Sequence, residues 1–161
     1  MATGARSVAE IARENRRVGD WLQEWARRFL SRIHAEVRVV GGVHVEAHTG
    51  PAPVGYDIAA DGLLYEVKGC CRTIRRSNVP RGRQAGRWKI DRHHHDALAP
   101  ELASRTLYLL IVRRGRRLQR AYLASHATLT RIMREHRATS RYVSLPHHVL
   151  EPMLREVYRA K

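Results

Sequence analysis

Two acidic residues and a lysine lie close together in the middle of the chain: Asp57, Glu66 and Lys68. Two carboxylates at one site can hold a divalent cation through oxygen ligands, and Mg²⁺ keeps several waters in such a site. We expect the backbone carbonyl of Val67 to supply one more oxygen. A bound cation acidifies a water that can attack phosphorus. Lys68 would orient or help deprotonate that water and offset charge on the phosphate.

A predicted β-hairpin brings these three residues together. Residues 56–59 form a short strand, Asp61-Gly62 is typical of a tight turn, and residues 63–68 form the returning strand. Glu66 and Lys68 are two positions apart, so they point to the same face of that strand, where Asp57 on the other arm can meet them.

A Glu-x-Lys pair on an exposed strand usually carries only solvated charge. Here the pair is embedded in apolar residues, which favours a buried strand, where charges need each other or a metal. These neighbours are Leu63, Leu64, Tyr65 and Val67.

The rest of the pattern predicts an α/β or α+β domain with a mixed sheet. Ser7-Val8-Ala9-Glu10 is a capping box that opens a long amphipathic helix, with a possible interruption at Gly19. Strands are expected over 36–47, 106–113, 118–123 and 142–145, and helices over 91–102, 125–136 and 146–158. The run 106–113 is continuously apolar, as in a buried central strand. The 161 residues predict one domain, with a core over about 18–125 and a helical extension over about 126–161.

The run Gly55-Tyr56-Asp57-Ile58, followed by a hairpin and then Tyr65-Glu66-Val67-Lys68, resembles the PD-(D/E)xK nuclease superfamily. This superfamily has the restriction-endonuclease-like fold and includes archaeal-type Holliday junction resolvases and Mrr-like restriction enzymes. The resemblance covers about residues 18–112. It implies an α/β fold, Mg²⁺- or Mn²⁺-dependent cleavage of phosphodiesters, DNA in preference to RNA, and a homodimer that pairs two sites.

Many members of that superfamily carry a further glutamate on the first helix. In the matching register this chain has Gln23, which can ligate a metal or hold a water with less charge. Glu24 and Glu14 are alternative candidates, and each of the three could equally be a surface residue.

The composition predicts a polyanionic partner. Thirty Lys and Arg against fifteen Asp and Glu give a formal net charge of +15, and arginine suits phosphate especially well. A basic stretch with Gly and Pro follows the hairpin and is expected to be a loop that grips the nucleic-acid backbone; a flexible solvated loop is the alternative. The residues expected to bind there are Arg72, Arg75, Arg76, Arg81, Arg83, Arg87 and Lys89. The basic turn at 113–117 could touch a more distant phosphate or simply aid solubility.

Other features of the sequence are less specific. His93, His94 and His95 are consecutive, so on a helix they point in different directions and make a poor zinc site. The adjacent Cys70 and Cys71 suggest a reducing, cytoplasmic location. A DNA partner would add association with the nucleoid. No apolar run is long enough for a membrane span, and no membrane partner is expected.

Two other functions remain open from the sequence. The same fold could be a nucleic-acid-binding module or subunit whose site is catalytically weak or inactive. Gln23 in place of glutamate favours this function. A basic RNA-associated protein would explain the charge but would leave the acidic hairpin unexplained.

Overall fold

The computed structural model describes residues 7–40, 56–75, 82–136 and 141–161. Its elements follow one another along the chain in this order: α1 (Val8–Leu30), β1 (Val37–Val39), β2 (Ile58–Ala60), β3 (Leu63–Cys71), β4 (Thr73–Arg75), β5 (Arg83–Ala85), β6 (Arg87–Asp91), α2 (Arg92–Asp96), α3 (Pro100–Ala103), β7 (Thr106–Arg114), β8 (Arg117–Ser125), α4 (His126–Glu135), β9 (Tyr142–Pro146), α5 (His147–Leu150), the 3-10 turn η1 (Glu151–Met153) and β10 (Arg155–Arg159).

A six-stranded mixed sheet in the order β1-β2-β3-β7-β8-β10 forms the centre of the fold. Strands β3 and β7 pair in parallel and the other neighbours are antiparallel. The expected α/β class with a mixed sheet is therefore confirmed. The apolar strand β7 is central, as its continuous hydrophobic run predicted, and residues 108–112 are all buried.

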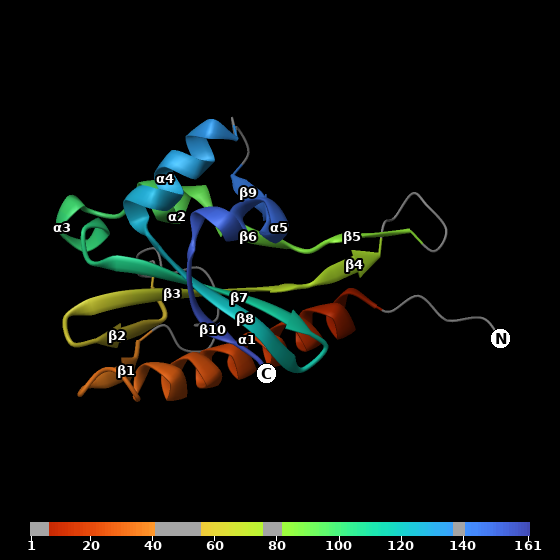
Figure 1. The fold of residues 1–161 in the computed structure, drawn as a ribbon, viewed down its shortest axis with the longest axis horizontal. Coiled ribbons are helices and arrows are strands. Elements are labelled where there is room, and N and C mark those ends of the chain that lie inside the picture. The colour runs from red at the N-terminus through yellow and green to blue at the C-terminus, as the bar shows by residue number, and fades with distance from the viewer. Residues whose placement is uncertain (1–6, 41–55, 76–81, 137–140) are drawn as a thin grey trace.

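Each face of the sheet is covered by its own layer (Figure 1). On one face lies α1, which packs Leu22, Ala26 and Leu30 against the sheet. On the other face lie α2, α4, α5 and the two-stranded β6–β9 ribbon, which bury Trp88 with Leu129 and other apolar side chains. Such burial on both faces explains why β7 carries apolar residues without alternation.

Several expectations for the elements are confirmed. The capping box is formed, because the Ser7 side chain accepts from the Glu10 backbone N–H and the Glu10 side chain accepts from the Ser7 backbone N–H. Helix α1 continues through Gly19 without the interruption considered from the sequence. The turn of the acidic hairpin has positive φ at both Asp61 (46°) and Gly62 (80°), the conformation that Asp-Gly favours in tight hairpins.

Other expectations were wrong. The last helix ends early, and β10 continues instead as an edge strand of the central sheet, so residues 126–161 are not a helical extension. The helix expected over 91–102 is two short helices, α2 and α3. The basic stretch expected to be a loop contains a β4–β5 ribbon, which projects from the body of the molecule (Figure 1). The first strand spans only Val37–Val39 of the expected range, and residues 41–47 lie outside the described residues.

Candidate functional site

Asp57 directly precedes β2, at the point where the pairing of β2 with β3 stops and β3 continues with β7 as its only strand neighbour. The last paired residues of β2 and β3 at this end are Ile58 and Tyr65. Just beyond them, the Asp57 backbone N–H donates to the Tyr65 carbonyl at 2.8 Å. The next hydrogen bond along this edge of β3 is made by a side chain and not by the backbone of β2: Asp57 Oδ2 accepts from the Val67 backbone N–H at 2.7 Å.

Gln23 reaches Asp57 from α1 on the other side. Its Nε2 donates to Asp57 Oδ1 at 2.9 Å, across 34 residues of sequence. The neighbouring Leu22 packs over Gly69 of β3, where a Cβ would lie only 2.2 Å from Leu22 Cδ1. This close approach of α1 to β3 allows the short amide side chain to touch the hairpin.

The two alternative residues of the first helix lie elsewhere. Glu24 is bound by Arg27 and Arg28 at 2.8 and 2.6 Å. Glu14 is exposed in the N-terminal half of α1, beside Arg13 and Arg17. Of the three candidates, only Gln23 has a hydrogen bond to the acidic hairpin in the described part of the chain.

Glu66 and Lys68 form an ion pair on one face of β3. Their side chains keep only 16% and 29% of their accessible surface. This face also carries Cys70, which belongs to the core on the side of the sheet away from α1. The pairing of the acid and the lysine follows from the two-residue period of a strand, as the sequence predicted.

Electrostatics within the site favour a cation. Burial, and then the negative charge of Glu66, raise the pKa of Asp57 to about 6, against the hydrogen bonds from Val67 and Gln23 and the charge of Lys68. Burial acts to lower the pKa of the Lys68 ammonium, but Glu66, Asp57 and Asp91 outweigh it, so its pKa is raised. Lys68 therefore keeps its proton at neutral pH, while two carboxylates repel each other beside it.

The oxygen atoms at this site suit a hard divalent cation. Asp57 and Glu66 supply carboxylates, and the carbonyl of Val67 lies on the same side of β3 as its N–H, facing Asp57. Rotation of the Gln23 amide would present a fourth oxygen. No three His, Cys, Asp or Glu side chains converge as a metal cage within the described ranges. The donors fit Mg²⁺, which needs few protein ligands because it keeps its waters.

Sequence reasoning missed two residues beside the site. Tyr108 of β7 is the register neighbour of Glu66, and its apolar surroundings in the sequence gave no signal beyond a core position. Asp91 was expected only as a helix cap. It does cap α2, accepting from the His93 N–H at 3.0 Å, but its charge also acts on Lys68. This effect of Asp91 on Lys68 depends on the packing of β6 near β3, which the sequence pattern does not reveal.

The basic residues expected to bind nucleic acid lie on and around the β4–β5 ribbon. Arg72 joins β3 to β4, and its carbonyl accepts from the Gly86 N–H at 3.1 Å and from the His147 ring at 2.8 Å. Arg76 and Arg81 lie outside the described residues, as does the Arg75 side chain. The remaining side chains, with that of Arg72, are exposed: Arg83, Arg87 and Lys89.

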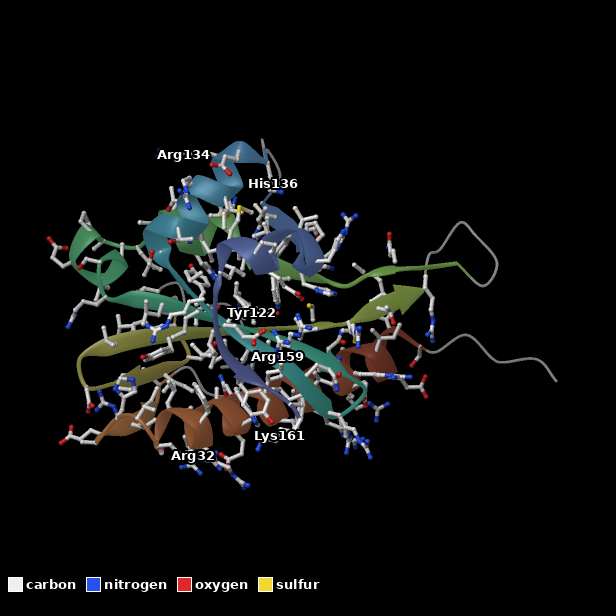
Figure 2. The ribbon with its side chains drawn as sticks, viewed as in Figure 1. Arg32, Tyr122, Arg134, His136, Arg159 and Lys161 are labelled. Atoms are coloured by element: carbon white, nitrogen blue, oxygen red, sulfur yellow. The ribbon has the colours of Figure 1, made fainter. Side chains whose placement is uncertain are left out.

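A second basic turn lies next to the end of β3. The β7–β8 turn carries Arg113, Arg114, Arg116 and Arg117, and the Arg113 carbonyl accepts from the Arg72 N–H at 2.7 Å. Basic side chains are not confined to this end: Figure 2 shows Arg134 on α4 and Arg32 after α1 on opposite sides of the molecule.

The histidines that the structure describes do not form a metal centre. His95 is buried and hydrogen-bonded to Tyr108 and Thr130, whereas His93 is exposed and His94 lies beside Asp91. Both cysteines are free thiols. Burial raises the pKa of the Cys70 thiol to about 12, which makes it a poor nucleophile.

No protein-family model matches the chain, and no curated protein matches it significantly. None of the helices in the described part of the chain combines the length and apolar character that a membrane crossing requires.

Proposed function

We propose that this protein is a metal-dependent nuclease of the PD-(D/E)xK type that hydrolyses phosphodiester bonds in DNA. One observation carries the proposal: two half-buried carboxylates, Asp57 and Glu66, stand at the end of a hairpin with the protonated Lys68 beside them. This arrangement follows the residue pattern of that superfamily position by position, with Gln23 in place of its first-helix glutamate.

Each residue has a role in the proposed reaction. Asp57, Glu66 and the Val67 carbonyl would hold Mg²⁺ or Mn²⁺, which supplies Lewis-acid activation of water and phosphate. Lys68, whose pKa is raised by the neighbouring carboxylates, would hold the scissile phosphate and offset charge in the transition state. Gln23 would fix the orientation of Asp57 through its amide hydrogen bond.

The arginines near the site would hold the nucleic-acid backbone. Arg72 directly follows β3, the strand that carries Glu66 and Lys68, and Arg83, Arg87 and Lys89 lie on the next described strands, β5 and β6. Such contacts raise affinity without reading base sequence. We infer structure-selective or non-specific cutting of DNA, by a homodimer if both strands of a duplex or junction are cut. An intracellular role in the nucleoid would follow from this activity.

A binding module of the same fold is the second candidate function. Gln23 favours it, because its amide donates a hydrogen bond to an oxygen of Asp57 where the superfamily places a third carboxylate. A neutral donor at this position weakens cation binding, and the domain would then hold DNA without cutting it.

Cleavage assays separate the two functions. Labelled four-way junction, duplex, single-stranded DNA and RNA are incubated with Mg²⁺, Mn²⁺ or EDTA, using wild type, Asp57→Ala and Lys68→Ala. Asp96→Ala is the matched control, because Asp96 is an exposed acid that pairs with Arg92. We expect metal-dependent cutting by wild type and the control, and none by the two site variants. If no substrate is cut while all four proteins bind DNA equally, the binding-module function replaces the nuclease.

A further inference from the structure

A buried histidine lies behind the candidate site. His95 of α2 is 1% exposed. Its Nδ1 is 2.7 Å from the Tyr108 hydroxyl on β7, and its Nε2 is 2.9 Å from Thr130 Oγ1 on α4. His126 stacks on it with ring centroids 3.8 Å apart, and the His126 Nε2 donates to the His95 carbonyl at 2.9 Å.

The hydrogen bonds run in a series from Tyr108 through His95 to Thr130. The bond that Thr130 makes at the end of this series determines the direction of the others. The Thr130 hydroxyl donates its only proton to the His126 carbonyl at 3.0 Å. Thr130 Oγ1 must therefore accept from His95, so the proton of His95 is on Nε2. Burial, and then His126, lower the pKa of His95 to about 4, so the ring is neutral and its Nδ1 is an acceptor. Tyr108 consequently donates its hydroxyl proton to His95.

Tyr108 is also the neighbour of Glu66. The two residues are partners in the parallel β3–β7 register, so their side chains lie side by side on one face of the sheet. Glu66 carries the charge that acts on Tyr108. A hydroxyl whose proton is committed to His95 cannot donate that proton to Glu66, and within the described residues the ion pair recorded for this carboxylate is with Lys68.

We propose that His95 is a positioning residue, set by Thr130, which turns the Tyr108 hydroxyl proton away from Glu66 and so keeps that carboxylate available to a divalent cation. This inference rests on the proposed function, since it gives a reason for keeping the Tyr108 proton away from the Glu66 carboxylate. Hydrogen bonds beyond the ligands of a metal commonly change its affinity about 10- to 100-fold.

Thr130→Val tests the direction of this series of hydrogen bonds without changing Asp57, Glu66 or Lys68. Valine has the shape of threonine but removes the acceptor of the His95 Nε2 proton. We expect the proton of His95 to move to Nδ1, where it donates to the Tyr108 oxygen, and the Tyr108 proton to turn to Glu66. Mn²⁺ should then bind roughly tenfold more weakly in calorimetry without DNA. The position of the ring proton is read from ¹⁵N–¹H correlation spectra of labelled histidine.

Two further variants separate this role from general damage to the fold. Tyr108→Phe removes the proton at issue and should bind Mn²⁺ like wild type. Combined with Thr130→Val, it should restore the lost affinity, whereas a merely structural role would make the double variant worse. Thr128→Val is the matched control on α4, because its hydroxyl bonds only Ser125 among the described residues.

The outcomes are distinguishable. If wild type binds no Mn²⁺, the proposed function fails and this inference fails with it. If wild type binds Mn²⁺ but Thr130→Val binds equally well, or Tyr108→Phe does not restore the affinity, only the role of His95 is overturned. A wild-type His95 protonated on Nδ1 would also overturn it.

Discussion

Two groups of interactions act in opposite directions on the pKa of Asp57. Both of its oxygens accept hydrogen bonds, from Gln23 and from the backbone of Val67. These bonds favour the ionised form, yet burial and the nearby Glu66 disfavour it more strongly, which raises the pKa. The charge is retained at neutral pH at a cost to the folded state, as is common where function and stability compete.

The pH dependence of stability follows from this shift. The pKa of Asp57 rises from 3.8 to about 6 on folding, so between these values the folded state binds the proton more tightly than the unfolded state. Stability should therefore fall as the pH rises from about 4 to about 6, by on the order of 2–3 kcal/mol from this group. Asp57→Asn should remove that fall, as measured by urea unfolding in EDTA at pH 4 and pH 7.5. The same pH-dependent difference in wild type and variant would contradict the assignment.

Gln23→Glu should strengthen the cation site and weaken the metal-free fold. A third carboxylate beside Asp57 and Glu66 adds repulsion when no cation is bound and adds an anionic oxygen ligand when one is. We expect a lower melting temperature than wild type in EDTA and a larger rise on adding Mg²⁺. The control is Gln84→Glu on β5, outside the site. An equal Mg²⁺-induced rise in wild type and Gln23→Glu would contradict a ligand position at residue 23.

At the scale of elements, the base of the β4–β5 ribbon depends on one glycine. A Cβ at Gly86 would lie 1.6 Å from the Cys71 carbonyl oxygen. The end of β3 and the start of β6 therefore approach so closely that only glycine fits at position 86. The ribbon therefore leaves the sheet at a point fixed by backbone contact between Gly86 and Cys71.

Gly86→Ala should accordingly destabilise the fold, because the Cys71 backbone must move. We expect a loss of on the order of 1–3 kcal/mol in chemical unfolding, as for other overpacked positions. Gly19→Ala is the opposite case: no atom lies within 4 Å of the added Cβ in α1, so alanine should stabilise the helix by about 0.5–1 kcal/mol. Equal stability of the two variants would show that the backbone contact is not restrictive.

Local patterns in the sequence predicted the elements that carry the site. The Asp61-Gly62 turn, the shared face of Glu66 and Lys68 on β3 and the capping box at Ser7 depend on neighbours in the chain, and all three are confirmed. The parallel neighbour of Glu66 could not be predicted, because Tyr108 is brought there by pairing across many residues. The C-terminal strand was mistaken for a helix because Pro146–Tyr158 has mixed periodicity, and its state is decided by pairing with β8.

At the scale of the whole molecule, a formal net charge of +15 sets the expected response to salt. Arginines without a carboxylate partner would exchange counterions with a nucleic-acid backbone, whereas those already paired contribute less. The β7–β8 turn belongs to the first group: no ion pair of Arg114, Arg116 or Arg117 is found within the described residues.

Replacing Arg114, Arg116 and Arg117 together by Gln should reduce the slope of log affinity for DNA against log salt by up to about three. A variant with the same loss of charge serves as the control: Arg27, Arg28 and Arg159 to Gln, which are paired with Glu24 or Glu156. Fluorescence anisotropy over a range of salt concentrations measures both slopes. Equal slopes would show that the β7–β8 turn does not contact the backbone.

The hydrogen bond between Gln23 and Asp57 joins parts of the chain 34 residues apart. The acidic hairpin, in contrast, is closed by a two-residue turn. Local hairpins form in microseconds, whereas parallel pairing such as that of β3 with β7 must wait for distant segments to meet. During refolding, the two carboxylates should therefore come together early, and α1 should reach them late. The hydrogen bond from Gln23 would then form with the slowest phase of folding, so that a half-folded chain would carry both carboxylates before Asp57 is held in its final orientation.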